Sequence, residues 1–293
     1  MEMIRNCPIC NGDKHKTVVS SKDFFLTQET FQIVECSKCG FRFTNPRPEP
    51  ASLGKYYEST EYISHSDKRK GLFASVYQLI RTYTLGRKQV LVEKYSPKGR
   101  ILDIGCATGH FLHHMKGNGW DTMGIEPDKK TRERAIKELG VEVYSEEKLD
   151  TMNNSEFDVV SLWHVLEHVP GLSTRMQQIN KVLKKRGILI LALPNPNSYD
   201  AIHYGEYWAG YDLPRHLYHF TKRDVETLLK KYGFALKAIR PMRFDSFYVS
   251  LLSEKYKTGK MKWLSAFGVG FISNLKARKD MNYSSLIYIA EKI

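Results

Sequence analysis

The chain has 293 residues, enough to bury a full hydrophobic core in one large domain or in a main domain with a small accessory one. Its hydrophobic content of 42% suits a globular protein, and no apolar run reaches the roughly eighteen residues that a membrane-spanning helix requires. The net charge of +13 attracts anions but cannot choose among nucleic acid, lipid headgroups and phosphate-linked small molecules. Because the amino terminus lacks a signal-peptide apolar stretch, we expect a cytoplasmic protein.

Residues 1–47 contain four of the five cysteines, as two C-x-x-C pairs: Cys7 with Cys10, and Cys36 with Cys39. In a reducing compartment such pairs favour a tetrahedral structural zinc site over disulfides, because thiolates are soft ligands. The 25 residues between the pairs exceed the usual spacing of about fifteen to twenty. We therefore expect a zinc-ribbon-like module with a long hairpin, and metal-free thiols in a diverged ribbon are the alternative.

Strands are predicted at 17–19 and 31–34 of this module, which has too little core to fold without metal. The proline-rich segment 44–50 predicts a stiff linker and the domain boundary. Residues 48–99 then hold the linker and N-terminal helices. Within them, the tyrosine-rich stretch 51–70 is interpreted as a surface segment or as a lid over a substrate cleft, and 72–95 as one or two helices.

Residues 100–128 read as a βαβ unit: an apolar run, a glycine-containing turn, a helix and a second apolar run that ends in Glu126. The turn from Gly105 to Gly109 lies at the carboxyl edge of a parallel sheet, where small residues let a ligand approach the backbone. Its G-x-x-x-G spacing differs from the dinucleotide fingerprint, which favours a nucleoside without a diphosphate. Glu126 would accept hydrogen bonds from the ribose hydroxyls.

Apolar runs predict the remaining strands at 141–144, 157–163, 188–193, 234–240 and 284–291. Helical spacing predicts helices at 131–139, 172–183 (ended by the basic run 184–187), 222–232 (capped by Thr221) and 261–275. In the last of these, Trp263, Phe267 and Phe271 recur among lysines. A dimer face or a substrate cap is favoured there over an interfacial membrane helix.

Several of these segments resemble one family in chain order. Residues 102–109 resemble motif I of the class I S-adenosylmethionine-dependent methyltransferases, and 124–126 resemble their ribose-binding strand end. Residues 163–169 resemble the motif that follows their fourth strand. The loop 214–220 resembles the Pro-Arg-His-x-x-x-Phe loop of a subgroup often associated with glycan and antibiotic-sugar pathways.

The resemblance implies an α/β fold: a doubly wound, seven-stranded Rossmann-like methyltransferase sheet over residues 100–293, preceded by the small zinc-ribbon-like module. It also implies in-line methyl transfer from S-adenosylmethionine, with the protein positioning donor and acceptor. The cofactor-binding residues would be Asp103, Gly105, Cys106, Ala107, Gly109, Glu126, Pro127, Leu162 and Trp163. Of these, Cys106 is interpreted as a small packing residue rather than a nucleophile.

Four histidines are candidate proton acceptors: His164, His168, His216 and His219. His164 and His168 are four residues apart and would share a helix face beside Glu167. The alternatives are that His164 only lines the sulfonium end of the cofactor, that His168 packs, and that the two loop histidines are structural. A metal site at Glu167 and His168 is the least favoured interpretation.

The predicted acceptor is a sugar or a nucleotide-linked sugar, because loop 208–220 offers donors and ring nitrogens in a basic protein. One alternative is a small aromatic or quinone-like acceptor, since 164–169 is similar to quinone-pathway methyltransferases. Another is a zinc-knuckle RNA-binding protein or RNA methyltransferase, although nucleic acid is the less favoured partner. A homodimer is also left open.

Overall fold

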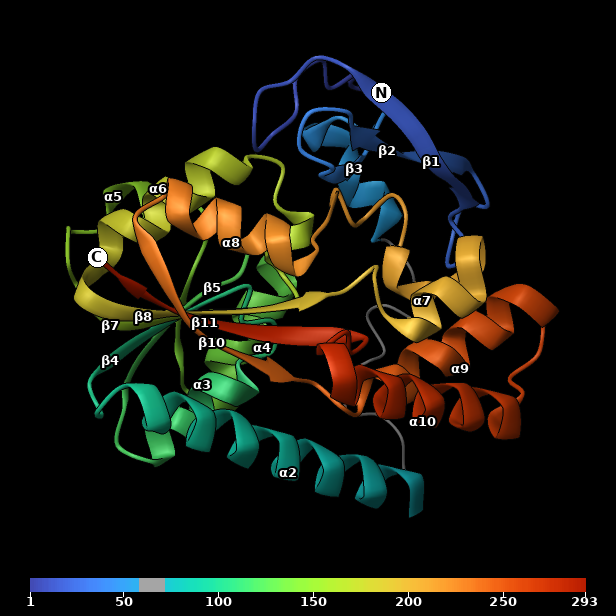
Figure 1. Ribbon diagram of the computed structural model, residues 1–293. Coiled ribbons are helices and arrows are strands. Elements are labelled where there is room, and N and C mark those ends of the chain that lie inside the picture. Colours follow the sequence, from blue (N-terminus) through green and yellow to red (C-terminus); the bar gives the residue numbers. More distant parts are fainter. Residues whose placement is uncertain (58–71) are drawn as a thin grey trace.

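The computed structural model describes residues 1–57 and 72–293, and the side chains of these residues except 72–80. In this part of the chain there are two sheets, one of seven strands and one of four (Figure 1). Residues 58–70, which hold most of the segment interpreted as a surface stretch or a lid, lie outside the described residues.

The seven-stranded sheet has the order β10-β11-β8-β7-β4-β5-β6, with β10 and β11 antiparallel at one edge and the other five strands parallel. The predicted doubly wound sheet is therefore confirmed. Its strands are β4 (Arg100–Ile104), β5 (Asp121–Ile125), β6 (Glu142–Tyr144), β7 (Phe157–Trp163), β8 (Leu183–Pro194), β10 (Phe234–Pro241) and β11 (Ser285–Lys292).

Helices cover both faces of this sheet, with α2 and α3 on one side and α6 and α8 on the other (Figure 1). The predicted cap of α8 is confirmed, because Thr221 and Asp224 form a reciprocal capping box. The helices of this layer are α2 (Leu72–Tyr95), α3 (His110–Gly117), α4 (Lys129–Leu139), α5 (Lys148–Thr151), α6 (Leu172–Val182) and α8 (Lys222–Lys231).

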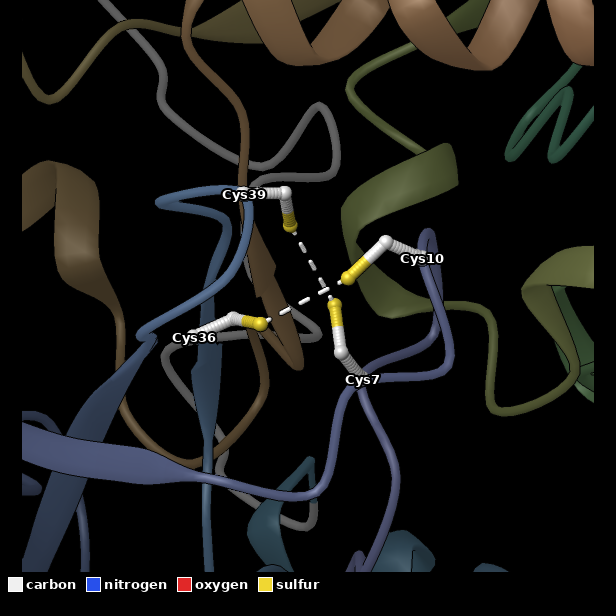
Figure 2. A group of neighbouring side chains, drawn as sticks. All are labelled: Cys7, Cys10, Cys36 and Cys39. Carbon is white, nitrogen blue, oxygen red and sulfur yellow. Dashed lines mark hydrogen bonds between the residues drawn. The ribbon is translucent and has the colours of Figure 1, made fainter.

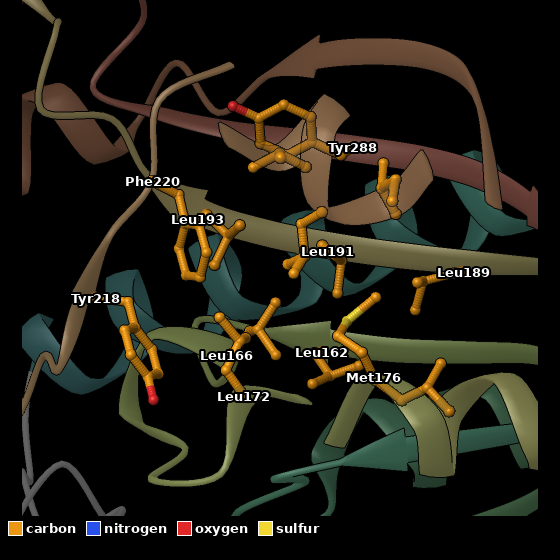
Figure 3. Packing of buried hydrophobic residues seen from close by; sticks show 14 of the residues in the cluster. Leu162, Leu166, Leu172, Met176, Leu189, Leu191, Leu193, Tyr218, Phe220 and Tyr288 are labelled. Carbon is orange, nitrogen blue, oxygen red and sulfur yellow. The ribbon is translucent and has the colours of Figure 1, made fainter. Parts of the chain in front are cut away.

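Strand β8 shows why the core has two halves. Leu189, Leu191 and Leu193 share one hydrophobic cluster with Met176 of α6, and Figure 3 shows them along that face. The intervening Ile188, Ile190 and Ala192 belong to a second cluster with residues of α2 and α3. Because successive strand side chains point to opposite faces, a continuous apolar run fits a strand covered on both sides.

One prediction about this strand is wrong. The basic run Lys184-Lys185-Arg186-Gly187 was expected to end the preceding helix, but α6 ends at Val182 and the run forms the start of β8. Arg186 has a left-handed backbone (φ 64°), and the pairing of β7 with β8 shifts register between Phe157 and Val159. This irregularity lets the strand begin five residues earlier than the apolar pattern indicates.

The four-stranded sheet joins the N-terminal module to the loop that follows β8. The two predicted module strands are confirmed as β1 (His15–Lys22) and β2 (Thr30–Cys36), and β2 also pairs with β3 (Arg42–Thr44). The fourth strand is β9 (Tyr218–His219), which pairs antiparallel with β3. The module's sheet is thus completed by a distant segment.

The segment predicted as a stiff linker packs on the same loop. Thr44 donates its backbone N–H to the carbonyl of Leu217 at 3.0 Å. The buried Arg47 guanidinium donates to the Tyr218 hydroxyl at 3.1 Å and to the Pro170 carbonyl at 3.3 Å. The short helix η1 (Pro50–Tyr56) follows. These contacts hold the module against the large sheet.

Arg215 makes a buried, charged link between the two parts. Its side chain is 1% exposed and donates to Asp212 at 2.7 Å, to Asp23 at 2.9 Å and to the Tyr56 carbonyl at 3.0 Å. Asp23 is itself fully buried and accepts N–H bonds from the turn after β1. The ion cluster therefore fixes the hairpin of the module to the loop.

Beyond this loop, two helices form an insertion between β10 and β11. They are α9 (Asp245–Thr258) and α10 (Trp263–Asp280). Within the described ranges, no helix combines the length and the apolar character needed to cross a membrane. The short helices of the preceding segments are η2 (Leu166–His168), α7 (Tyr199–Tyr204), η3 (Gly205–Tyr207) and η4 (Ala209–Tyr211).

Replacing Arg215 with Met should lower the free energy of unfolding by about 3–5 kcal/mol, because Asp23 would keep a buried charge without its partner. The matched control is Lys16→Met, which removes a 66% exposed lysine paired with Glu35 and should cost less than about 1 kcal/mol. Urea unfolding followed by circular dichroism measures both. Equal stability of the two variants would contradict a structural role for this ion cluster.

Candidate active site

The turn between β4 and α3 holds three residues with left-handed backbone: Gly105 (φ 72°), Ala107 (φ 47°) and Gly109 (φ 77°). A Cβ on Gly105 would lie 2.5 Å from the side chain of Val165, and one on Gly109 would lie 2.8 Å from Val141. The glycines are thus required first by packing within the protein. Val165 also places the segment after β7 directly beside this turn.

Glu126 lies across the same turn, at the end of β5. One carboxylate oxygen accepts the Ala107 N–H at 2.9 Å, and the other accepts the Asp128 N–H at 2.9 Å. The side chain is therefore held at the carboxyl edge of the sheet and does not point into the apolar core. Burial raises the pKa of Glu126, against the lowering effect of the two N–H bonds.

Asp103 on β4 is buried and accepts a hydrogen bond from the Ser161 hydroxyl at 2.6 Å. Burial raises its pKa to about 7. Near it lies Lys88 of α2, whose ammonium stands 4.1 Å from the centre of the Trp163 ring and whose pKa burial lowers to about 8. Sequence reasoning missed Lys88, because one lysine in an amphipathic helix gives no signal.

The remaining predicted cofactor residues differ in accessibility. Cys106 packs in a small apolar cluster with Leu112, and burial raises the pKa of its thiol, in agreement with a packing role. Leu162 is fully buried in the main core (Figure 3), which leaves no side-chain surface for a ligand. Pro127 is exposed, and Trp163 is half-buried with an indole N–H that has no hydrogen-bond partner among the described residues.

The expected shared helix face of His164 and His168 does not form. His164 has a left-handed backbone (φ 57°), and only Leu166–His168 forms a short 3₁₀ turn. The His164 ring lies between two carboxylates, 3.2 Å from Asp245 and 3.5 Å from Glu167. Burial alone would lower its pKa, but the carboxylates raise it to about 10. His164 is therefore charged at neutral pH and unsuited to accept a proton.

His168 instead meets His216 of the loop, with ring centres 4.5 Å apart. Nδ1 of His168 lies 3.1 Å from the Arg215 carbonyl and 3.0 Å from the Tyr57 hydroxyl, and Nδ1 of His216 lies 2.9 Å from the Gly210 carbonyl. Because a carbonyl can only accept, both rings donate from Nδ1, which leaves a lone pair on each Nε2. Burial and the neighbouring His216 lower the pKa of His168 to about 4.

Glu167 completes this cluster. One ligand atom each from Glu167, His168 and His216 lies within 4.8 Å of the others. Within the described part of the chain the buried Glu167 carboxylate accepts no hydrogen bond, and His164 lies 3.5 Å from it. Two imidazoles and a carboxylate can exchange protons or coordinate a divalent cation. A metal site at Glu167 and His168 is the least favoured interpretation of the sequence, and no local pattern connects either residue with His216.

Hydrogen bonds to backbone carbonyls hold loop 208–220 beside Glu167. Leu217 donates its N–H to the Glu167 carbonyl at 2.7 Å, and the Thr44 hydroxyl donates to the His216 carbonyl at 2.7 Å. His219 lies within β9, where its Nε2 is 3.2 Å from the Thr44 hydroxyl, and burial lowers its pKa well below the ordinary value. Of the four candidate histidines, the structure thus brings together only His168 and His216.

The four cysteines of the two C-x-x-C pairs converge (Figure 2). The Sγ atoms of Cys7 and Cys39 lie 3.6 Å apart, as do those of Cys10 and Cys36. Tetrahedral zinc with Zn–S bonds of about 2.3 Å has sulfur–sulfur edges of about 3.8 Å, whereas a disulfide bond is about 2.0 Å long. The four thiols therefore fit one tetrahedral ion, and zinc suits an all-sulfur donor set.

Comparison with known proteins agrees with this fold. The family model of the methyltransferase domain matches residues 77–239, more than half of the chain. Ubiquinone biosynthesis O-methyltransferase from Nitrosococcus oceani is 29% identical over 175 residues, which cover 55% of this chain and 72% of that protein. The protein of the same name from Maricaulis maris is 31% identical over 152 residues, covering 47% of this chain and 60% of its own.

Solved structures show the same fold at lower identity. A SAM-dependent methyltransferase from Archaeoglobus fulgidus has a TM-score of 0.50 and 19% identity, covering 72% of this chain and 94% of its own. Magnesium protoporphyrin IX methyltransferase from Synechocystis PCC 6803, solved with bound SAH, has a TM-score of 0.54 and 13% identity, covering 84% and 100%. With the family match and this sheet order, the chain belongs to the methyltransferase domain family and is an S-adenosylmethionine-dependent methyltransferase.

Proposed function

We propose that this enzyme methylates a hydroxyl group of a small aromatic or quinone-like acceptor. The observation that carries the proposal is the cluster of Glu167, His168 and His216, beside the cofactor turn that Val165 contacts. The curated relatives, named as ubiquinone biosynthesis O-methyltransferases, support the same class of acceptor.

The sugar acceptor predicted first loses its physical support, because the loop uses its donors internally. Arg215 is buried between Asp212 and Asp23, the Tyr218 hydroxyl donates to the Pro170 carbonyl, and His219 contacts Thr44. Neither relative cited above is named for RNA, so the RNA interpretations gain no support either. The cytoplasmic location and the homodimer stay predictions.

In the proposed reaction, S-adenosylmethionine supplies an electrophilic methyl group. The histidine pair would take the proton of the acceptor hydroxyl as its oxygen receives that methyl group, and the donor sulfur would keep the electrons of the broken carbon–sulfur bond. His216 can take the proton at Nε2, and the nearby Glu167 carboxylate would stabilise the resulting imidazolium. Asp103 and Glu126 would orient the aminoacyl and ribose parts of the cofactor.

We further propose that Cys7, Cys10, Cys36 and Cys39 bind a structural zinc ion. Phe41 and Phe43, which follow the second cysteine pair, pack in the same core as Tyr218 and Phe220 of the loop. Zinc would therefore stabilise the part of the module with which β9 pairs. Through β9 it would also support the histidine cluster, although the cysteines lie far from that cluster in the sequence.

Replacing Glu126 with Gln should weaken S-adenosylmethionine binding by about tenfold to a hundredfold, because a charge-assisted acceptor of the ribose hydroxyls is lost. Isothermal titration calorimetry measures the affinity. Glu133→Ala on the following helix, where the side chain is 63% exposed, is the control and should bind as wild type. Unchanged affinity in a folded E126Q variant would remove Glu126 from the ribose site.

Replacing His216 with Asn should lower kcat by about a hundredfold or more while the affinity for S-adenosylmethionine stays within about twofold, because only the proton acceptor is lost. Assays with labelled cofactor should use two panels, hydroxylated aromatic and quinol compounds and nucleotide sugars. The control is His203→Asn, which changes an exposed histidine. Methyl transfer only to the nucleotide sugars would refute the proposed acceptor class.

Purified protein should contain one zinc ion per chain, and Cys39→Ser should lose it and unfold about 10 °C lower or more, since zinc binding contributes to folding. Elemental analysis and a thermal melt measure the two effects. Lys38→Ala changes an exposed residue between the same two cysteines and should keep both zinc and stability. A metal-free wild-type protein with the same melting temperature would contradict the zinc assignment.

A further inference from the structure

The outer face of α10 is apolar. Four large side chains follow one another along it at helical spacing, and each is exposed: Leu264 (93%), Phe267 (51%), Phe271 (57%) and Leu275 (40%). Trp263 at the start of the helix is 55% exposed and stacks with Phe267. We name these five residues the α10 stripe. A contiguous exposed stripe of this kind marks an interaction surface.

The opposite face of the helix is small and tightly packed. Ala266, Ser273 and Ala277 are buried, and a Cβ on Gly270 would lie 2.9 Å from the Phe247 ring of α9. This close contact fixes the rotation of α10, so the stripe points outward and covers no part of the described active site. The substrate cap expected at this helix stays a prediction, and the large side chains that would form it face solvent.

The charges around the α10 stripe are mostly positive, and the two acidic residues next to this region are the buried Glu254 and the exposed Asp280. Residues 255–279 contain seven basic side chains and no acidic one: Lys255, Lys257, Lys260, Lys262, Lys276, Arg278 and Lys279. All seven are exposed, and they lie before and after the apolar stripe along the chain. An exposed apolar band with basic side chains at both ends complements an anionic membrane, which offers negative headgroups above an apolar layer.

The same charges disfavour the homodimer alternative. In a two-fold dimer each copy presents the same patch, so the lysines at both ends of the stripe would face lysines of the second copy. An anionic lipid surface instead offers opposite charge together with an apolar layer for Leu264 and the aromatic rings. Aromatic side chains such as Trp263 suit the boundary between the two.

The geometry points to peripheral binding of this protein to anionic lipid bilayers through the α10 stripe and its flanking lysines. The inserted side chains would be Leu264, Phe267 and Phe271, and the lysines would contact the lipid phosphates. This inference goes beyond the proposed function and does not depend on the identity of the acceptor.

Vesicle flotation tests it with the full-length protein. We expect wild type to bind vesicles of phosphatidylcholine with about one third phosphatidylglycerol, to bind phosphatidylcholine alone at least tenfold less, and to be released by high salt. Leu264→Gln with Phe271→Gln should lower the partition coefficient about a hundredfold, and Lys260→Gln with Lys262→Gln about tenfold. The control is Ile136→Gln, an exposed apolar residue on α4, which should bind as wild type.

Trp263 provides a second measurement. Its indole should move from water into the interface, so vesicles should shift the fluorescence of wild type to shorter wavelength, and Trp263→Phe should abolish the shift while the protein still floats. Failure to float on anionic vesicles, or equal flotation of the L264Q/F271Q variant, would overturn the inference. It would also fall if light scattering showed a dimer that the same two substitutions dissociate and vesicles bound neither protein.

Discussion

The buried ion cluster around Arg215 is the interaction on which the arrangement of this enzyme depends. Its guanidinium joins Asp23 of the N-terminal hairpin to Asp212 of the loop after β8, and all three lie in the region where the two sheets meet. A buried charge is tolerated only when its partners are in place, so module and loop must adopt their positions together. That coupling also sets the position of the next residue, His216.

From this point the chain builds the candidate site by backbone pairing. Strand β9 adds to β3, Leu217 bonds to the Glu167 carbonyl, and His216 reaches His168 beside the segment that follows β7. In the proposed site, the N-terminal module would support the acceptor side, whereas β4 and β5 would supply the cofactor side. The domain of the seven-stranded sheet would bind the cofactor. The packing of the N-terminal module against the loop after β8 would complete the place where the acceptor reacts.

The same pairing explains why residue types alone misled the interpretation of the loop. Arginine, tyrosine and histidine in a glycine-rich and proline-rich segment are typical of ligand binding, but here Arg215, Tyr218 and His219 bond within the protein. Each is buried, and a buried polar group needs a partner before it can serve a ligand. His164 is a similar case, because Asp245, eighty-one residues away in sequence, helps to keep it protonated.

Apolar periodicity, turn glycines and ligand spacing are local properties of the chain, so they were enough to predict the doubly wound sheet, the glycine turn with Glu126 beside it, and the two cysteine pairs. Which polar residues stay available depends instead on contacts between segments that are far apart in the chain. Strand β9 has two residues and no local signal, and the charge of His164 depends in part on the distant Asp245. The meeting of Glu167, His168 and His216 requires the pairing of β9 with β3 and the bond from Leu217 to Glu167. Burial and long-range partners set these properties, and the residues adjacent in sequence indicate neither of them.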